Sequence, residues 1–256
     1  SPDIAVKMAK EQGWSNLTLR TGFNAEMAER HSAQAKLAAM TSTDSELILD
    51  IPDLPATMTL YYDDTFQQNF EASVLASIPI TSNYAESMAT HAIILDRTCF
   101  YPEGGGQEGD YGKLISESSA HTVIDTKKVG NLVVHISTGP FEIGDIVQGM
   151  IDWDRRKQLM DHHTSVHIVG GAARKLLGPH IYQAGSNKSA DSSRLDITHH
   201  RRLTRKDLDQ IESIANEVVQ NVQRIEKLTL NRKDADRKFG FDLYQGGAPK
   251  GSEIRI

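Results

Sequence analysis

Cysteine and long apolar runs are almost absent from this sequence. Cys99 is the single cysteine, which excludes an internal disulfide framework and a zinc site made of cysteines alone. Nowhere do the roughly eighteen consecutive apolar residues of a membrane-spanning helix occur. Residues 1–10 also lack the basic start and apolar stretch of a signal peptide. We therefore expect a cytoplasmic protein that has no membrane partner.

Basic residues are scarce in the first part of the chain. Residues 1–150 contain 9 lysines and arginines against 20 acidic residues, whereas residues 151–256 contain 19 against 14. The overall charge of −6 thus hides a net −11 followed by a net +5. Because attraction to phosphates depends on local charge, the second part is a candidate for contact with an anionic partner. Solvated faces of charged helices explain the same asymmetry and are favoured on charge alone.

The composition changes near Pro55. Before it, the pattern predicts a helical segment, residues 1–54, with helices over 2–13 and 24–40 and then a polar connector. The chain starts without a methionine and stops within an alternating apolar and polar run, residues 253–256. We therefore expect a fragment of a longer protein.

Short runs rich in β-branched and aromatic residues, separated by Asp, Gly and Pro turns, fill residues 55–154. The expected strands are residues 58–62, 70–75, 91–95, 131–136 and 143–153. Their length and spacing predict a small antiparallel β-barrel.

Residues 155–256 mix helical and strand patterns. The expected elements are a helix over 155–177, strands within 182–198, a helix from Thr204 to Ile225 and a short helix over 232–239. Thr204 and Asp207 form a capping pattern at the start of one helix, and Gly178 ends another. We expect an α/β core with a two-helix layer on a sheet. The chain as a whole is predicted to be α+β.

Histidines are concentrated between residues 162 and 200, which hold six of the ten. His163 and His167 stand four apart on the expected helix and so share one face. Two imidazoles placed this way can bind one Zn²⁺, although two ligands alone do not make a site and a solvated helix face is the more common explanation. The residues between them include no glutamate to act as a general base, so zinc-protease chemistry is disfavoured.

A glycine-rich turn lies within the expected barrel. Gly104, Gly105 and Gly106 follow Pro102 and precede Gln107, and such a run lets backbone amides approach a ligand closely. The segment matches neither the dinucleotide-binding nor the phosphate-loop fingerprint. A tight barrel corner is the more common explanation of such a pattern.

Polar and basic side chains surround the histidine helix in the sequence. Gln183 could orient a carbonyl or a hydroxyl group by hydrogen bonds, and an ordinary polar loop is the alternative. Arg155, Arg156, Arg201 and Arg202 are candidate phosphate contacts, and simple solvation is again the alternative.

Four segments, residues 95–107, 162–167, 183–186 and 194–199, together form a specific combination. In this combination the chain resembles archaeal-type alanyl-tRNA synthetases, from the end of their tRNA-recognition region through most of their editing domain. The freestanding AlaX-type editing proteins share these motifs. The helical start of the chain is similar to the synthetases rather than to those shorter relatives.

The resemblance implies hydrolysis of Ser-tRNA(Ala) and Gly-tRNA(Ala) made by mistake, because a pocket built for alanine excludes glycine and serine poorly. It also implies that His163 and His167 are zinc ligands, with a further cysteine and histidine expected beyond Ile256. Thr164 and Gln183 would read the serine hydroxyl or position the attacking water.

The resemblance further implies a domain organisation of three segments. Residues 1–54 would end the tRNA-recognition region, residues 55–154 would be a β-barrel editing subdomain, and residues 155–256 would be a zinc-type editing core truncated at its C-terminus. The implied tRNA contacts are Gly104, Gly105, Gly106, Gln107, Arg155, Arg156, Arg201 and Arg202.

The implied partners are tRNA(Ala), especially its acceptor end, and the remaining domains of the parent synthetase, which bind ATP. Two other hypotheses remain open. One is a catalytically silent fragment that docks tRNA but lacks a complete zinc site. The other is an unrelated metallohydrolase whose further ligands would come from Asp161, His180 or His199.

Overall fold

The computed structural model describes residues 49–80, 88–221, 225–243 and 252–256. The chain divides into two compact units, residues 1–49 and 50–256, and the elements below belong to the second. The helices expected over 2–13 and 24–40 lie outside the described residues. Within the described ranges no helix has both the length and the apolarity needed to cross a bilayer.

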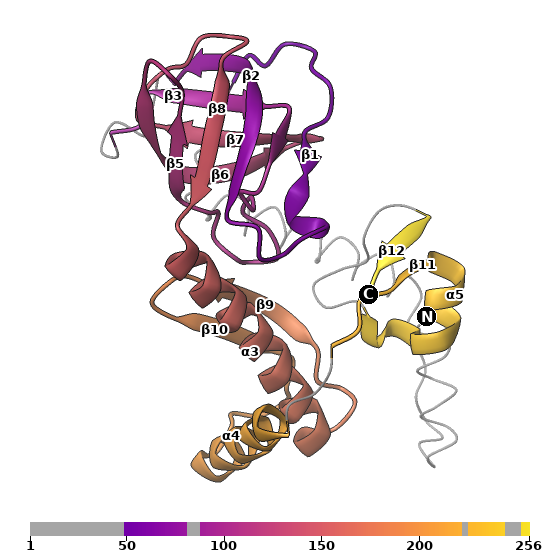
Figure 1. The fold of residues 1–256 in the computed structure, drawn as a ribbon. Coiled ribbons are helices and arrows are strands. Elements are labelled where there is room, and N and C mark those ends of the chain that lie inside the picture. The colour runs from indigo at the N-terminus through magenta and orange to yellow at the C-terminus, as the bar shows by residue number, and fades with distance from the viewer. Residues whose placement is uncertain (1–48, 81–87, 222–224, 244–251) are drawn as a thin grey trace, which may run out of the picture. The chain divides into compact units, whose positions relative to one another are not determined.

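Six antiparallel strands close into a barrel (Figure 1). Around the barrel they are β2 (Asn69–Pro79), β3 (His91–Leu95), β7 (Leu132–Ser137), β6 (Ala120–Val129), β5 (Gly112–Ile115) and β8 (Ile146–Ile151), which pairs again with β2. Burial alternates residue by residue along β2 and β8, as expected for strands with one face in a core and one in water. The predicted small antiparallel barrel is confirmed.

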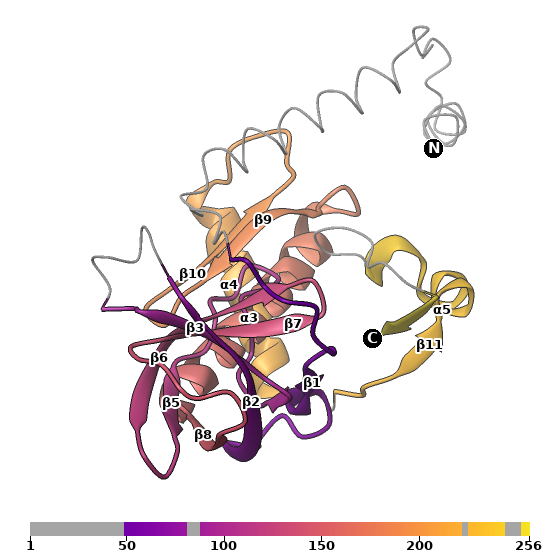
Figure 2. The ribbon, with the colours of Figure 1, turned by 90° about the horizontal axis from the view of Figure 1, so that it is seen from above.

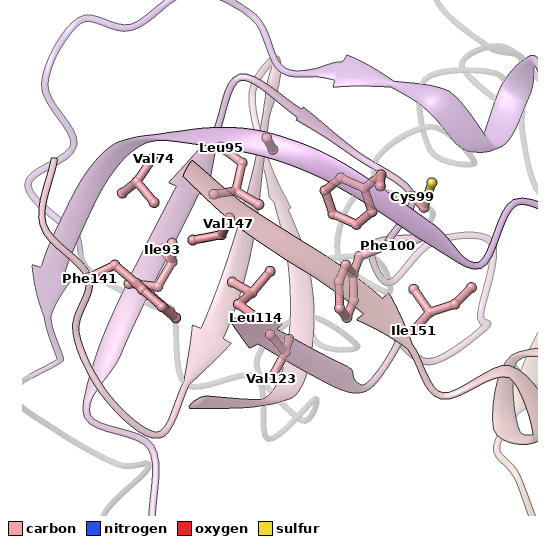
Figure 3. Packing of buried hydrophobic residues seen from close by; sticks show 12 residues of the cluster. Val74, Ile93, Leu95, Cys99, Phe100, Leu114, Val123, Phe141, Val147 and Ile151 are labelled. Atoms are coloured by element: carbon pink, nitrogen blue, oxygen red, sulfur yellow. The ribbon is translucent and has the colours of Figure 1, made fainter. Parts of the chain in front are cut away.

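Side chains from several strands fill the barrel interior (Figure 3). The cluster comprises Phe70, Ala72, Val74, Ile93, Leu95, Cys99, Phe100, Leu114, Val123, Phe141, Val147 and Ile151. The rings of Phe70 and Phe100 meet edge to face, with centroids 5.9 Å apart. Cys99 is a free, fully buried thiol, and burial raises its pKa to about 11. It therefore acts as a small apolar group in the core.

The strand predicted over residues 58–62 is wrong in its second half. Only β1 (Met58–Thr59) is extended, and it pairs in parallel with β4 (Arg97–Thr98). The chain then turns into a 3-10 helix, η1 (Leu60–Tyr62), in which the side chain of Tyr61 is buried. Packing of the aromatic rings decides this conformation, because Tyr61 lies against both Tyr62 and Tyr101.

Helix α3 (Trp153–Leu177) starts directly after β8. The carboxylate of Asp152 accepts a hydrogen bond from the backbone N–H of Arg155 and so caps the helix, and Gly178 ends it with a φ of 115°. A hairpin of β9 (Gln183–Lys188) and β10 (Ser193–Ile197) lies beside α3 in both views (Figures 1 and 2).

Helix α4 (Arg205–Gln220) packs on α3 through the buried side chains Ala172, Ala173, Ile181, Ile211 and Ala215. The capping box predicted from Thr204 and Asp207 is present. The prediction that this helix reaches Ile225 is wrong. It ends at Gln220, with Asn221 as its C-terminal cap, and Ile225 is exposed.

The remaining described elements form a small α/β unit. Strands β11 (Thr229–Asn231) and β12 (Glu253–Arg255) are antiparallel neighbours, and α5 (Arg232–Phe239) and the 3-10 helix η2 (Gly240–Leu243) follow β11. Helix α5 has the bounds predicted from its sequence. The side chain of Asn231 accepts from the N–H of Lys233, and Gly240 provides the C-terminal cap.

Candidate functional site

One cavity brings α3, the glycine-rich turn and β9 together. Its volume is about 330 Å³, and we call it the histidine cavity. It is lined by Gly105, Gly106, His163, His167, Gln183, Ala184, Gly185 and Lys188. Residues separated by more than eighty positions in the sequence thus share one lining.

The glycine-rich segment forms a tight turn that docks on β9. Gly104 and Gln107 exchange two backbone hydrogen bonds of 3.0 Å, and the two residues between them have φ values of +60° and +75°. Such positive values favour glycine in a two-residue hairpin turn. A Cβ atom on Gly106 would overlap the carbonyl oxygen of Ser186, so the close approach also requires glycine there. The turn is therefore both a barrel corner and a wall of the cavity.

Gln107 fixes the orientation of His163. The Gln107 side chain is 3% exposed, and its Oε1 accepts a hydrogen bond of 2.9 Å from Nδ1 of His163. With the proton on Nδ1, the lone pair of the ring resides on Nε2. Burial, the charge of Lys188 and the neighbouring His167 lower the pKa of His163 to about 4. The ring is therefore neutral at pH 7.

His167 lies one helical turn after His163. The two rings stack with centroids 5.1 Å apart and an angle of 18° between their planes, as the spacing predicts. In the part of the chain that the structure describes, no third histidine, cysteine or carboxylate joins them as a potential ligand. The donors here match half of a tetrahedral zinc set.

Lys188 was not predicted from the sequence. It is 1% exposed, and its Nζ donates to the carbonyl oxygen of Gly105 and to Oγ of Ser186, both at 2.6 Å. Burial lowers the pKa of Lys188. Nothing in the local sequence identifies this lysine, because its partners belong to a turn 83 residues away and to its own strand.

Gln183 offers an unused acceptor to the cavity. Its Nε2 donates to Oγ of Ser186 at 3.1 Å, whereas its Oε1 is covered from solvent and has no hydrogen-bond partner among the described residues. A buried carbonyl oxygen without a donor is unfavourable by about 1–3 kcal/mol. A ligand that brings an N–H or O–H group into the cavity would satisfy it.

A second hollow of about 230 Å³ adjoins the first, and we call it the tyrosine pocket. It is lined by Tyr61, Tyr62, Thr65, Tyr101, Gln107, Arg156, Met160, His163, Thr164 and Arg255. Tyr62 is half exposed, and the guanidinium carbon of Arg255 lies 4.6 Å from the centre of its ring. His163 lines both hollows and so stands between them, whereas Gln107, which holds its ring, lines the tyrosine pocket.

The structure does not bring Thr164 and Gln183 together. Thr164 belongs to the tyrosine pocket, and its hydroxyl donates to the carbonyl oxygen of Met160 at 3.0 Å. Gln183 lies in the histidine cavity. His163 stands between these two predicted residues.

The predicted arginine contacts fall into two groups. Arg155 donates to Gly109 and Glu108 at 2.7 Å each, and Arg156 forms a buried ion pair with Asp110. Both guanidinium groups thereby fasten α3 to the barrel. Arg201 forms two hydrogen bonds with the carboxylate of Asp207 at the start of α4.

Arg202 is exposed, like Arg201. Burial raises the pKa of Asp110, and the charge of Arg156 opposes that rise. The two buried partners thus depend on one another, whereas Arg201, which pairs with Asp207, is exposed.

Comparison with known proteins adds a relationship to this geometry. The family model of class II tRNA synthetases (A) matches residues 1–155. An alanine–tRNA ligase of Metallosphaera sedula is 40% identical over 259 residues, one of Ignicoccus hospitalis is 37% identical over 259, and one of Pyrococcus furiosus is 40% identical over 258. Each alignment covers 100% of this chain and 27% of the relative, so the chain spans about a quarter of the length of these ligases.

Proposed function

Since this chain belongs to the class II tRNA synthetases (A), we propose that it is the editing portion of an alanine–tRNA ligase and hydrolyses Ser-tRNA(Ala) and Gly-tRNA(Ala). A synthetic site shaped for alanine admits glycine and rejects the serine hydroxyl weakly, so a second hydrolytic site is needed. The observation that carries the proposal is the unused acceptor of Gln183 in the histidine cavity.

The aminoacyl group occupies the histidine cavity in this proposal. A volume of about 330 Å³ accommodates a seryl or glycyl ester. The hydroxyl of a seryl group would donate to Oε1 of Gln183, which alanine cannot do. A hydrogen bond of this kind is how a site distinguishes a hydroxylated substrate from its apolar analogue.

His163 and Lys188 supply the chemistry of hydrolysis. The lone pair on Nε2 of His163 accepts a hydrogen bond from water and orients it toward the ester carbonyl carbon. A group with a pKa of about 4 is a weak base, so His163 positions the water rather than retaining its proton. The ammonium of Lys188 stabilises the negative charge that develops on the carbonyl oxygen.

The reaction balances without a covalent enzyme intermediate. The water oxygen bonds to the carbonyl carbon, and the bond from that carbon to the ribose oxygen breaks. One water proton ends on the ribose oxygen, which becomes a hydroxyl, and the other leaves as the new carboxyl group ionises. The products are the free amino acid and uncharged tRNA. No serine triad is required.

Zinc is an alternative occupant in the proposal: held by Nε2 of His163 and by His167, it would take the lone pair that otherwise orients the water, and it would supply Lewis-acid chemistry instead. The bond from His163 Nδ1 to Gln107 is typical of a metal-ligating histidine, whose second nitrogen is usually anchored. Two ligands are half of the set that zinc needs, and the remaining cysteine and histidine are those expected beyond Ile256. We therefore route no step of the hydrolysis through the metal.

The tyrosine pocket suits the single-stranded 3′ end of the tRNA. Unpaired bases stack on aromatic faces and on guanidinium planes, and Tyr62 with Arg255 presents both. An ester linking a nucleotide in this pocket to an amino acid in the histidine cavity would pass His163, which lines both. Arg201 and Arg202 remain candidates for the acceptor stem, and the turn from Gly104 to Gln107 for the acceptor end.

Deacylation of Ser-tRNA(Ala) by the full chain tests this proposal. We expect turnover, and we expect Gln183→Leu to lower it at least tenfold while tRNA binding is retained. Gln148→Leu is the matched control, because Gln148 lies on the barrel surface, where its Nε2 donates to Glu71. Binding without turnover by the unaltered chain would instead support a silent docking fragment. Equal turnover by Gln183→Leu and Gln148→Leu would exclude the proposed role of Gln183.

A further inference from the structure

Three histidines meet where the end of α3 and the end of β10 come together, outside the histidine cavity. His180 follows the turn that ends α3, and His199 and His200 follow β10. Thr198 joins the two segments: its Oγ1 donates to the carbonyl oxygen of His180 at 2.7 Å, and its N–H donates to that of Tyr182 at 2.9 Å. We call His180, His199 and His200 the triple-histidine cluster.

The rings of the cluster are in mutual contact. The centroid distances are 5.1 Å from His180 to His199, 4.5 Å from His199 to His200 and 5.6 Å from His180 to His200. One nitrogen of each ring lies within 4.8 Å of one nitrogen of both others. Among the described residues, this is the only group of three histidine, cysteine or acidic side chains arranged in this way.

The ring nitrogens of His180 and His199 are incompletely hydrogen-bonded. Nε2 of His180 and Nδ1 of His199 lie 2.9 Å apart, so the two rings share one proton. Nε2 of His199 is covered from solvent and has no hydrogen-bond partner within the described part of the chain. A bound cation would replace the proton that Nε2 of His180 and Nδ1 of His199 share, and both nitrogens would then be ligands.

Three imidazoles are a ligand set for divalent transition ions. Zinc takes nitrogen ligands at about 2.0–2.1 Å, which places neighbouring ligand atoms of a tetrahedron about 3.3 Å apart. The separation of 2.9 Å between His180 and His199 needs only a small increase to reach this value. His180 and His200 are exposed, so their rings can rotate at little cost and a water can take the fourth position.

The positive charge of the arginine next to the cluster opposes a bound cation only weakly. Arg201 adjoins the cluster, but its guanidinium is neutralised by two hydrogen bonds to the carboxylate of Asp207. The backbone around the cluster is also held in place. Ile181 is buried in the core between α3 and α4, and Ile197 and Leu203 pack against that core.

We propose that the triple-histidine cluster binds one divalent transition ion, with zinc as the representative species. The ion would link the end of α3 to the segment that leads from β10 into α4. It would thus stabilise the C-terminal end of α3 without belonging to the histidine cavity. This site does not depend on the proposed hydrolytic activity.

Zinc binding to the chelator-treated full chain tests the proposal, with Co²⁺ as a spectroscopic probe. The test variants are His180→Ala/His200→Ala, which removes two cluster ligands, and His163→Ala/His167→Ala, which removes the pair on α3. Equilibrium dialysis gives the stoichiometry and affinity, and the visible absorption of bound Co²⁺ gives the coordination. Circular dichroism confirms that each variant is folded.

We expect one zinc ion to remain bound to His163→Ala/His167→Ala, and we expect His180→Ala/His200→Ala to weaken that binding at least tenfold. The single variants His180→Ala and His200→Ala should each weaken it as well. Binding lost in His163→Ala/His167→Ala and kept in His180→Ala/His200→Ala would overturn the proposal. Absence of zinc binding by the unaltered chain at micromolar concentrations would overturn it too.

Discussion

At the scale of single residues, the close approach of the glycine turn to β9 depends on a missing methyl group. Gly106 has a φ of +75°, and a Cβ atom there would overlap the carbonyl oxygen of Ser186. Gly130 has a similar φ of +58°, but nothing lies within 4 Å of its Cβ position. The two glycines therefore have similar backbone conformations, and they differ in how closely other atoms surround the Cβ position.

We predict that Gly106→Ala lowers the free energy of unfolding by more than Gly130→Ala does. Both substitutions cost about 1 kcal/mol for a left-handed conformation. Gly106→Ala must also displace β9, which adds about 1–3 kcal/mol. Urea titrations of the two variants measure this difference. Equal destabilisation would mean that the turn does not press on Ser186.

How far the sequence predicts the site differs from residue to residue. His163 and His167 are predictable because helical periodicity alone puts residues four apart on one face. Lys188 is not, since its role depends on a turn 83 residues away that only the tertiary fold brings near. Thr164 precedes His167 in the same motif, yet the helix turns its side chain toward the tyrosine pocket. The catalytic and tRNA-contact roles of these residues stay predictions.

At the scale of elements, one buried ion pair joins the barrel to α3. The side chains of Arg156 and Asp110 are 4% and 1% exposed, and Oδ2 of Asp110 also accepts a hydrogen bond of 2.8 Å from the N–H of Tyr101. Removing one partner leaves the other charge buried without compensation. The pair therefore couples the folding of two elements that are far apart in the sequence.

We predict that Arg156→Met destabilises the protein by about 3–5 kcal/mol. Adding Asp110→Asn should recover part of this loss, because the amide still accepts from Tyr101 but carries no charge. Arg205→Ala serves as the control: its partner Asp209 lies one turn away in solvent, so a change of about 0–1 kcal/mol is expected. Chemical denaturation of the four proteins gives the comparison, and a small effect of Arg156→Met would argue against tight coupling of barrel and helix.

The start of α4 depends on a cap that the sequence displays directly. Thr204 Oγ1 accepts from the N–H of Asp207, and the Asp207 carboxylate accepts from the N–H of Thr204. We predict that Thr204→Ala lowers stability by about 1 kcal/mol, whereas Thr204→Ser stays near the unaltered protein. Thermal unfolding of both variants measures this, and identical melting of the two would show that the hydroxyl contributes nothing.

Local signals explain which elements were predictable. Helix α5 was predicted with its correct bounds because its caps are adjacent residues, Asn231 and Gly240. Helix α4 was extended too far because its apolar spacing continues past Asn221, where the chain leaves the helix. Strands β5 and β6 were missed, since charged residues interrupt them and only partners on both sides keep them extended. Closure of the barrel supplies those partners.

At the scale of the whole molecule, one buried histidine links stability to pH. His135 is fully buried: its Nδ1 donates to the carbonyl oxygen of Ile93 at 3.0 Å, and its Nε2 accepts from the hydroxyl of Thr98 at 2.8 Å. Burial lowers the pKa of His135 from 6.5 to about 4, and the hydrogen bond to Ile93 opposes this only in part. The folded protein therefore keeps this ring neutral in mild acid.

We predict that stability falls as the pH decreases from about 6.5 to about 4. In that window the unfolded chain binds a proton on His135 and the folded chain does not, which amounts to at most about 3 kcal/mol. The lowered pKa of His163 acts with the same sign, and the raised pKa values of Asp110 and Asp125 act with the opposite sign. Urea titrations at several pH values measure how the free energy of unfolding changes with pH. The His135→Gln variant should be less stable than the unaltered protein at pH 7, and its free energy of unfolding should depend less on pH.

The route of the chain also sets when the histidine cavity can first exist. The glycine turn at residues 104–107 belongs to the barrel, yet its wall is completed by His163 and by Lys188 far downstream. During synthesis, a ribosome-bound chain that has emerged only through β8 holds the turn but no cavity. The proposed hydrolytic site is therefore complete only after Lys188 has left the exit tunnel, and a chain that terminates before Lys188 would contain the barrel but not this cavity.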